Sequence, residues 1–502
     1  MRTTDSKQFR DPVHGYIELP DEFCRKYVDT DLFQRLRFIE QSSMRMLYPA
    51  ARHDRFIHSL GVYSIAKRVW ENVECSFKAV FSRKSLLTKF KETFLVAALL
   101  HDCAHSPFSH TGEAIAKKYC NSEIETKLKK AVGTKNFKAD FYDEDRSVRY
   151  STHEMASAYV GCERFRKVFG KNVDREQFAR MIIGLKNKND KSECKLAFNC
   201  LIVLINGFIV DVDRLDYLQR DTWATGICNA SVDIDRLISG IEVDVTTGKV
   251  GIKHTALSSI VNAVAARDFI FQWVITHHIV AYANEIIKKA IESLIEALAT
   301  KQMSKASVGN CLFSPDRLLP GQDALIKGEC VYLPTDGDIL YLMKKYIPGN
   351  KYYKAYINRD RVHISLWKTH AEFVNIFTFG ARQCDLDVLK DSKFWEGFAS
   401  KLDKFTRLNP HCICTKPMKI KTTKHRIRKL DANIDMALSS QIIGRKTLDL
   451  TFIFGDEEKN DQFCFNAFIE KEYADSPKMG ASVIIQELQK LMLDSIAEYE
   501  GA

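Results

Sequence analysis

The amino-acid sequence predicts a mainly α-helical protein with two regions, a helical domain at residues 1–305 and a smaller mixed α/β lobe at residues 306–502. Apolar residues recur at helical spacing through the first region, whereas alternating segments, which are typical of strands, occur only in the second. Glycines and prolines between residues 309 and 321 indicate a break in regular structure between the two regions. A chain of 502 residues also exceeds the size that one hydrophobic core usually serves.

The helical domain is predicted to begin with three helices that each have an apolar face. Thr30 or Asp31 provides an N-cap for the first, and His58 lies near the start of the second. The third covers residues 92–102, ends in His101-Asp102, and is followed by the helix-stopping Pro107. The apolar positions that define the first two helices are Phe33, Leu36 and Ile39, and then Phe56, Leu60 and Ile65.

Three later segments complete this domain, and the second region contains two expected hairpins. Residues 117–150 are polar and predict a surface helix or a mobile insertion, whereas residues 198–222 and 257–299 predict long buried helices. Alternation predicts one hairpin at residues 352–367, around Asn358-Arg359-Asp360, and another at residues 448–473, turning through Gly455–Asp461.

Composition excludes several classes of protein. No run of 18 apolar residues occurs, and the first residues contain no apolar core of a signal peptide, so neither a membrane span nor secretion is expected. The 14 cysteines are scattered without C-x-x-C pairs, which is typical of reduced thiols in the cytoplasm or nucleus. The net charge of +10 suits polyanionic ligands, either nucleotides or nucleic acid. Residues 411–430 hold seven Lys or Arg and no acid, which indicates either a solvated basic segment or a phosphate- or polynucleotide-binding surface.

Metal-ligating residue types gather in three separated segments. The apolar helix before residue 103 ends in His101-Asp102. A buried helix does not normally carry an adjacent His and Asp, because burying them costs free energy unless a partner such as a divalent metal compensates for it. Asp213 follows the apolar run LIVLINGFIV, and Tyr217 and Asp221 share its helix face at a spacing of four residues. Asp216 and Arg220 form a parallel pair, interpreted as a structural salt bridge. The predicted metal ligands are His58, His101, Asp102 and Asp213.

A set of two histidines and two carboxylates suits Mn, Fe, Zn or Mg rather than a structural zinc. Such a metal can activate water and neutralise charge on a transferring phosphoryl group. His105 and His110 follow the His-Asp pair closely in the sequence, and His153 is a further histidine expected near it. All three are candidates for phosphate contact and for proton transfer to a sugar 5′-oxygen.

At these residues the chain resembles the HD-domain phosphohydrolases, and among them the deoxynucleoside triphosphate (dNTP) triphosphohydrolases. It is most similar to the animal branch that carries a sterile-alpha-motif domain, although no such domain is expected here. The resemblance covers nearly the whole chain and implies a helical HD-domain core with a smaller mixed α/β lobe. The segments that carry it are DPVHGYIEL (11–19), FQRLRFIEQ (33–41), RFIHSLGV (55–62), LLHDCAHSPFSH (99–110), DVDRLDYLQRD (211–221) and LDLTFIFGDEEKN (448–460).

The resemblance implies residue roles, a substrate and a form of regulation. It implies hydrolysis of dNTPs to deoxynucleoside and inorganic triphosphate, GTP activation, and a homo-oligomer, either a dimer or a tetramer. The implied catalytic residues are His153, His110 and Glu113, and the implied substrate contacts are Gln41, Arg55, His105, His110, Arg214, Tyr217 and Asp221. The implied effector residues are Lys7, Asp29, Gln34 and Arg37, with Arg236 and Lys253 at a second effector site.

Two alternative functions stay open, and the sequence departs from that of the animal enzyme in two places. The first alternative is an HD phosphohydrolase that acts on nucleoside monophosphates or cyclic nucleotides; the second is a nucleotide-sensing or nucleic-acid-binding protein with a silent HD site. Ser42-Ser43-Met44 replaces the apolar residue and glycine run of the animal enzyme. Residues 267–285 lack the Arg and Tyr-Gln pattern that the animal enzyme uses on phosphate and sugar, and Thr276, Asn284 and Glu285 fall near those places. Selection between deoxyribose and ribose therefore stays open.

Overall fold

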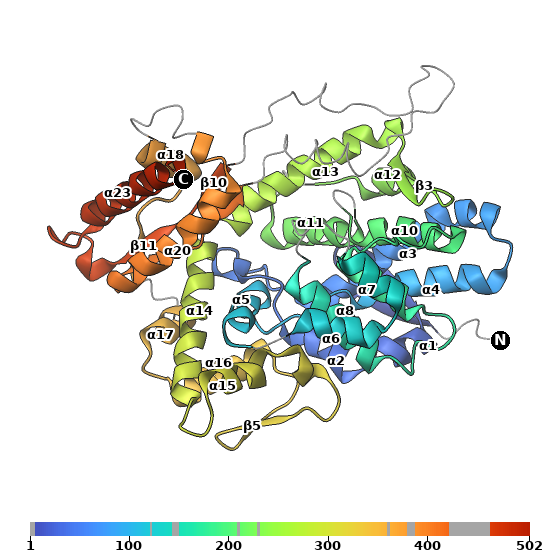
Figure 1. Cartoon of the computed structure of the whole chain (residues 1–502), viewed down its shortest axis with the longest axis horizontal. Helices are drawn as coiled ribbons and strands as arrows, with labels where there is room; N and C mark the ends of the chain where they lie inside the picture. The colour runs from blue at the N-terminus through green and yellow to red at the C-terminus, as the bar shows by residue number, and fades with distance from the viewer. Residues whose placement is uncertain are drawn as a thin grey trace.

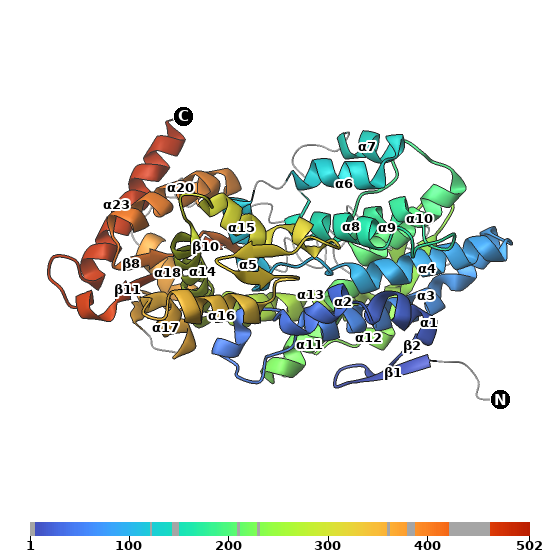
Figure 2. The same ribbon diagram turned by 90° about the horizontal axis from the view of Figure 1, so that it is seen from below.

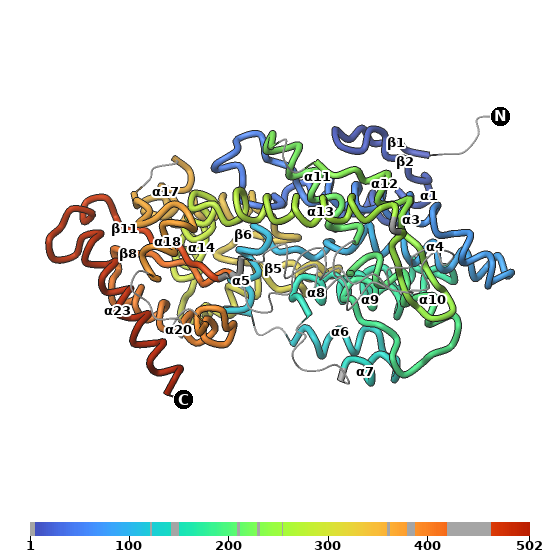
Figure 3. The backbone as a smooth tube through the Cα atoms, turned by 90° about the horizontal axis from the view of Figure 1, so that it is seen from above, coloured from blue at the N-terminus to red at the C-terminus, as the bar shows by residue number. Residues whose placement is uncertain are grey.

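The computed structural model describes residues 6–120, 123–142, 150–207, 211–227, 231–358, 362–378, 387–420 and 462–501. Helices dominate these residues, and the strands form only small sheets, which confirms the mainly α-helical prediction. Figure 1 shows the N-terminal helices at one end of an elongated molecule and the orange-to-red C-terminal elements at the other. Figures 2 and 3 show the same separation from below and from above.

The helices fall into an N-terminal and a C-terminal series. The first is α1 (Asp21–Phe23), α2 (Asp31–Arg35), α3 (Arg55–Val80), α4 (Lys84–Leu100), α5 (Ser109–Tyr119), α6 (Ile124–Val132), α7 (Lys135–Tyr142), α8 (Thr152–Arg164), α9 (Arg175–Ile183), α10 (Glu193–Ile205), α11 (Val212–Thr225), α12 (Ile234–Ser239), α13 (Leu257–Ile270) and α14 (His278–Leu298). The second is α15 (Lys305–Phe313), α16 (Asp336–Tyr346), α17 (Lys351–Ile357), α18 (His370–Thr378), α20 (Ser392–Leu408) and α23 (Ala481–Glu500).

The strands pair antiparallel in small sheets at the edges of the helical body and in the C-terminal part. A three-stranded sheet has the order β7-β11-β8, and the other pairs are β1-β2, β3-β4, β5-β6 and β9-β10. The strands are β1 (Ser6–Asp11), β2 (Gly15–Pro20), β3 (Ile241–Asp244), β4 (Lys249–Ile252), β5 (Ala324–Ile326), β6 (Glu329–Val331), β7 (His363–Ser365), β8 (Cys412–Cys414), β9 (Met418–Ile420), β10 (Gln462–Cys464) and β11 (Ala467–Glu470).

Three clusters of buried apolar side chains hold these elements together. The largest joins the β1-β2 hairpin to the helices from α2 to α13, except α5. A second cluster lines the long helix α14 and packs it against α5, α15, α16 and α17. The third holds α18, α20 and α23 against the β7-β11-β8 sheet. The second cluster contains residues from either side of residue 305, and the domain boundary placed there stays a prediction.

Most predicted helices of the first region are present, with corrected ends. Thr30 is the cap of α2, because its side chain accepts a hydrogen bond from the Phe33 N–H, but the helix ends at Arg35 and Ile39 is extended. The segment 117–150 contains α6 and α7, and residues 198–222 contain α10 and α11. The predicted long helix at 257–299 is broken into α13 and α14 by a π-helical turn at Phe271–Ile275.

The hairpin predicted at residues 352–367 is wrong. Residues 351–357 form helix α17, which Asn350 caps by accepting hydrogen bonds from the Tyr352 and Tyr353 N–H groups. Buried Ala355 and Tyr356, one turn away from Tyr352, pack in the cluster around α14, so a helical face was misread as alternation. The turn predicted at Gly455–Asp461 and most of the basic segment at 411–430 lie outside the described residues, although β10 and β11 end the second predicted hairpin region. Across the part of the chain that the structure covers, none of the helices has the length and apolar character that a bilayer crossing requires.

Candidate functional site

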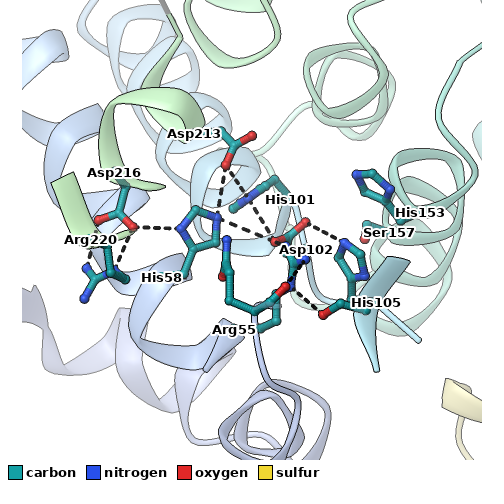
Figure 4. Close-up of polar contacts among 12 residues, drawn as sticks. Arg55, His58, His101, Asp102, His105, His153, Ser157, Asp213, Asp216 and Arg220 are labelled. Atoms are coloured by element: carbon teal, nitrogen blue, oxygen red, sulfur yellow. Dashed lines mark hydrogen bonds and ion pairs between the residues drawn. The ribbon is translucent and has the colours of Figure 1, made fainter. Parts of the chain in front are cut away.

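The ends of three helices bring the predicted metal ligands together. Asp54 caps α3 by accepting a hydrogen bond from the Ile57 N–H, which places His58 in the first turn of that helix. Helix α4 ends at Leu100, so that His101 and Asp102 follow directly on its axis. Asp211 caps α11 in the same way through the Arg214 N–H, and Asp213 therefore lies in the first turn of α11. Figure 4 shows these side chains pointing toward one another.

The four side chains form a compact set of two imidazoles and two carboxylates. Nε2 of His58 lies 3.0 Å from Oδ1 of Asp213 and 3.6 Å from Oδ2 of Asp102. Nε2 of His101 lies 3.6 Å and 3.4 Å from the same two oxygens. Both imidazoles are almost fully buried, whereas the Asp213 side chain is 39% exposed and leaves the cluster open on one side. The predicted ligands thus meet at one point.

This set fits a divalent metal ion. Nε2 of His58 and Nε2 of His101 are buried and have no hydrogen-bond partner among the described residues. Metal bonds of about 2.0–2.2 Å place neighbouring ligand atoms about 3.0–3.6 Å apart, which is the range observed here. The ligand atoms of His58, His101 and Asp213 all lie within 4.8 Å of one another, and Oδ2 of Asp102 lies 3.6 and 3.4 Å from the two imidazole nitrogens, so the set suits a metal centre.

The charges of the cluster indicate the same requirement. Burial opposes ionisation of Asp102, but the charges of Arg55 and His101 outweigh it and hold the pKa of that carboxyl well below its ordinary value. Burial would also lower the pKa of His101, yet the facing carboxylates raise it well above its ordinary value. The carboxylates therefore stabilise positive charge in this buried site. A metal ion and protons compete for the same ligand atoms.

A buried network orients His58 toward the centre. Nδ1 of His58 lies 2.7 Å from Asp216, whose other oxygen lies 2.6 Å from Nε2 of His14. Arg220 donates to both Asp216 oxygens, at 2.9 and 2.8 Å, as the predicted salt bridge requires, and also to Asp11 at 2.9 Å. A carboxylate behind a ligating histidine fixes the ring so that its other nitrogen faces the metal. Asp216 therefore orients a ligand in addition to forming its salt bridge.

Two further backbone features support the ligands. His101 is oriented by a contact of 2.9 Å from its Nδ1 to the Ala98 carbonyl oxygen. Gly61 lies beside the Asp216-Arg220 pair, and a Cβ at that position would stand 1.8 Å from an Asp216 oxygen. Only glycine therefore allows α3 to approach α11 closely enough for His58 to reach Asp216.

Arg55 lies beside the cluster and is held by protein groups on three sides. Its Nη1 lies 2.5 Å from Oδ2 of Asp102, its Nε donates to Ser109 Oγ at 3.1 Å, and its Nη2 donates to the Gln41 carbonyl at 3.2 Å. The buried guanidinium therefore neutralises and orients Asp102. Gln41 itself is buried, and its Oε1 has no hydrogen-bond partner in the described part of the chain.

A second histidine cluster adjoins the first. His105, His110 and His153 place ring nitrogens within 4.8 Å of one another, and the ring of His105 stacks on His153 at a centroid distance of 4.5 Å. Glu113 binds the Nδ1 atoms of His153 and His110 through its two oxygens, at 2.6 and 3.3 Å. His105 lies 3.7 Å from Oδ1 of Asp102, which connects the two clusters. All four predicted residues are therefore brought together.

These histidines differ in their charge state. Burial and the positive charge of Arg55 hold the pKa of His105 well below its ordinary value, so this imidazole is neutral. Burial also acts against the charged form of His153, but the hydrogen bond and the charge of Glu113 outweigh it and raise its pKa. The arrangement provides one neutral imidazole and one that holds a proton, and the latter has the property of a general acid near neutral pH.

Helix α11 carries the remaining predicted substrate residues. Arg214 contacts Asp211 at 3.3 Å, and Asp221 is buried against Nε2 of His53 at 2.8 Å. Burial raises the pKa of Tyr217, while the charges of Arg267 and Arg214 oppose this shift. Arg267 on α13 was not among the predicted site residues, yet it lies close to Tyr217 and its buried Nε has no hydrogen-bond partner among the described residues. Arg267 begins the segment 267–285, which lacks the Arg and Tyr-Gln pattern of the animal enzyme, so the resemblance implied no role for it.

The predicted effector residues form two separate groups. Lys7 lies 2.5 Å from Asp29, and Arg37 donates to Gln34 at 2.8 Å while its guanidinium stacks on Phe56 at 3.5 Å. Gln8, Arg10, Arg37 and Phe56 are among the residues that line a cavity of about 320 Å³. In the second group, Arg236 donates to the Thr255 carbonyl and Lys253 to that of Ser239, so both lie at the corner between α12 and β4.

Comparison with known proteins agrees with this geometry. Residues 55–172, which contain His58, His101 and Asp102, match the family model of the HD domain. The uncharacterized protein YwfO of Bacillus subtilis is 28% identical over 58% of this chain and 56% of its own length. A deoxynucleoside triphosphate triphosphohydrolase SAMHD1 homolog of Dictyostelium discoideum is 29% identical over 44% of this chain and 37% of its own length. The chain thus spans about half the length, or less, of these curated relatives.

Two solved structures share the fold across most of the chain. A hypothetical protein from Aquifex aeolicus superposes with a TM-score of 0.57 at 21% identity, covering 93% of this chain and 97% of its own. A phosphohydrolase from Bacteroides thetaiotaomicron gives a TM-score of 0.56 at 19% identity, covering 93% of this chain and 100% of its own. The segment that matches the HD domain therefore contains three of the four residues of the His-Asp cluster.

Proposed function

We propose that this protein is a metal-dependent dNTP triphosphohydrolase that cleaves dNTPs to deoxynucleoside and inorganic triphosphate. The observation that carries the proposal is the direct contact between a four-residue metal set and a cluster of histidines that includes a proton-holding His153. Arg214 and Arg267 lie near Tyr217 beside this site and provide positive charge for a long polyanion. The similarity to triphosphohydrolases named for dNTP substrates supports the choice of substrate.

The chain's own residues perform distinct tasks in this reaction. A divalent ion held by His58, His101, Asp102 and Asp213 would supply water activation and charge neutralisation at the α-phosphorus. Water attacks that phosphorus and releases a proton to solvent, and the bond from phosphorus to the sugar 5′-oxygen breaks. His153, held at Nδ1 by Glu113, donates a proton from Nε2 to the leaving 5′-oxygen. Neutral His105 and exposed His110 provide hydrogen bonds to phosphate oxygens, and Gln41 Oε1 accepts one from the sugar.

Product analysis separates this proposal from its alternatives. The purified protein is incubated with each dNTP and Mn²⁺, with and without GTP, and the products are identified. Deoxynucleoside plus inorganic triphosphate supports the proposal. Turnover of nucleoside monophosphates or cyclic nucleotides alone replaces it with another HD phosphohydrolase activity. Absence of turnover, together with RNA or DNA binding that weakens steeply with salt, replaces it with a binding function.

The pH profile tests the Glu113–His153 pair. Because the Glu113 charge raises the pKa of His153, the proton that acts as the acid is retained to higher pH in the wild type and lost as pH rises through that pKa. Glu113→Gln removes the charge and is expected to move the alkaline limb of kcat/KM to lower pH. Steady-state rates between pH 5 and 10 measure the shift. An alkaline limb that stays in place in this variant would assign the proton donor elsewhere.

GTP activation in a homo-oligomer is part of the proposal. Exposed Arg37 lines the cavity of about 320 Å³, and Lys7, which pairs with Asp29, directly precedes the lining residue Gln8. These residues offer charge and hydrogen bonds for a guanine nucleotide. Arg37→Ala is expected to reduce the GTP stimulation of hydrolysis by at least about tenfold, while metal content and the rate without GTP are retained. Arg68→Ala, which removes a surface pair with Asp235, is the matched control. Equal GTP stimulation in both variants and the wild type would refute the effector site.

A further inference from the structure

The loop that follows the His101-Asp102 pair has an unusual backbone. Phe108 and Ser109 both adopt the left-handed region, with φ values of 59° and 49°, although neither is glycine. Non-glycine residues persist in this region only where the surroundings impose it. This loop leads from His105 to His110 and begins helix α5. Something outside the loop must therefore hold it in place.

Asp336, distant in the sequence, holds this loop. It is 8% exposed, and its Oδ1 accepts a hydrogen bond of 2.6 Å from the Phe108 N–H. Its Oδ2 accepts another, of 3.0 Å, from the Glu40 N–H. One carboxylate thus joins the strained loop to the segment that contains Gln41. Each oxygen is used by one of the two segments, so both oxygens are needed as acceptors.

Arg35 makes a second connection between the same parts of the chain. Its Nη2 donates to the His105 carbonyl at 2.8 Å, and its Nε donates to the Pro334 carbonyl at 2.8 Å. Arg35 and Asp336 therefore secure both ends of the loop to the residues that begin helix α16. Burial raises the pKa of Asp336 to about 6, while the two backbone N–H groups and the charge of Arg35 oppose this shift, so the carboxylate that accepts both hydrogen bonds is present above that pH.

The loop and the Glu40 segment together position the groups around the metal set. Ser109 Oγ donates to the Glu40 carbonyl at 2.5 Å and accepts from Arg55 Nε at 3.1 Å. Arg55 in turn contacts Asp102. A continuous series of polar contacts therefore runs from Asp336 through the Glu40 backbone to Ser109. From Ser109 it continues through Arg55 to the predicted metal ligand Asp102.

We propose that Asp336 is a positioning residue for phosphohydrolysis, through which the first turn of α16 holds the His105–Ser109 loop and Arg55 in their working arrangement. The inference rests on the proposed function for the reaction that it serves. It assigns to a residue 234 positions after Asp102 the task of maintaining the geometry of the site. Misplacement of reacting groups by about 1 Å can cost about a hundredfold in rate, so loss of this residue acts on turnover.

Asp336→Asn is the sharpest variant, because it keeps the size of the side chain and removes one of two acceptors. Its NH₂ group would face either the Phe108 or the Glu40 N–H, and one hydrogen bond is lost. The matched control is Asp338→Asn on the same helix turn. Asp338 is exposed and, among the residues that the structure describes, accepts hydrogen bonds only from Thr335, so this change weakens the cap of α16 without touching the loop.

Two measurements on the full-length, metal-loaded protein test the proposal. Asp336→Asn is expected to lower kcat for a dNTP by about tenfold to a hundredfold with less than about a threefold change in KM, while the metal content stays at the wild-type value. Hydrogen–deuterium exchange of peptides covering residues 36–42 and 104–110 is expected to accelerate in this variant. Asp338→Asn is expected to match the wild type in both measurements.

The outcomes separate this inference from the proposed function. Unchanged kcat and exchange in Asp336→Asn, with an active wild type, would overturn the positioning role and leave the proposed function standing. A loss of rate that only follows a loss of folded protein, seen equally in Asp338→Asn, would also overturn it. If the wild type hydrolyses no dNTP, the proposed function fails. Faster exchange confined to the two peptides in Asp336→Asn still supports the role of Asp336 in holding the His105–Ser109 loop.

Discussion

Replacing both His101 and Asp102 by alanine is expected to abolish metal binding and to reduce hydrolysis to the uncatalysed background. The change removes two of the four ligands, whose imidazole nitrogens and carboxylate oxygens lie 3.0–3.6 Å apart, and the two that are left cannot hold a divalent ion tightly. Metal content by elemental analysis and product formation from dNTPs with Mn²⁺ are the measurements. Full activity in the double variant would remove the site assignment.

A second variant keeps this test independent of folding. Loss of Asp102 leaves the buried guanidinium of Arg55 without its partner, which costs about 3–5 kcal/mol in comparable cases and can unfold the chain. Asp213→Asn avoids this problem, because the Asp213 side chain is 39% exposed. The substitution removes the charge of one ligand and leaves the buried Arg55–Asp102 pair intact. It is expected to bind metal far more weakly while retaining the thermal midpoint of the metal-free wild type. His110→Gln, outside the metal set, is the control that retains the metal.

Replacing His153 by asparagine is expected to lower kcat by about 10²–10⁴-fold while the metal is retained. The imidazole lies outside the metal set, and its Nδ1 is held by Glu113 at 2.6 Å, so its loss removes a proton donor and not a ligand. The expected loss depends on the leaving group, because the 5′-oxygen of a nucleoside requires a proton as it departs. Steady-state rates of the variant and the wild type with dTTP measure the effect.

The leaving group provides the control for this prediction. p-Nitrophenyl triphosphate releases a phenolate that needs no proton at neutral pH, so His153→Asn is expected to lose little of its rate with this compound. An equal loss with both substrates would show that His153 positions the phosphates instead of donating a proton. Metal content and thermal midpoint equal to those of the wild type exclude a structural cause.

Local sequence features indicated four residues that the structure brings together, because each of them lies at the end of a helix. His58 follows an N-cap, His101 and Asp102 follow an apolar helix, and Asp213 follows another cap. Each position could be recognised within a short segment, and residue chemistry then indicated that the segments meet. The mainly α-helical fold was predicted for the same reason, since helical periodicity is local.

The groups that support the site were harder to predict, because their partners are distant in the sequence. His14 reaches Asp216 across 202 positions, and Asp336 reaches Glu40 across 296. No spacing rule connects such residues, and each one alone is an ordinary polar residue of a loop or a helix end. The hairpin wrongly predicted at residues 352–367 has a related cause, because the short apolar segment at residues 352–357 fits a strand or a helix, and only packing against α14 selects the helix.

Soaking crystals of the protein with Mn²⁺ and recording anomalous diffraction tests the central claim most directly. We expect one strong anomalous peak, about 2.0–2.3 Å from Nε2 of His58, Nε2 of His101, and one oxygen each of Asp102 and Asp213. The same peak should disappear in Asp213→Asn crystals. A map without a peak between these four side chains, or with manganese bound only elsewhere, would contradict the account.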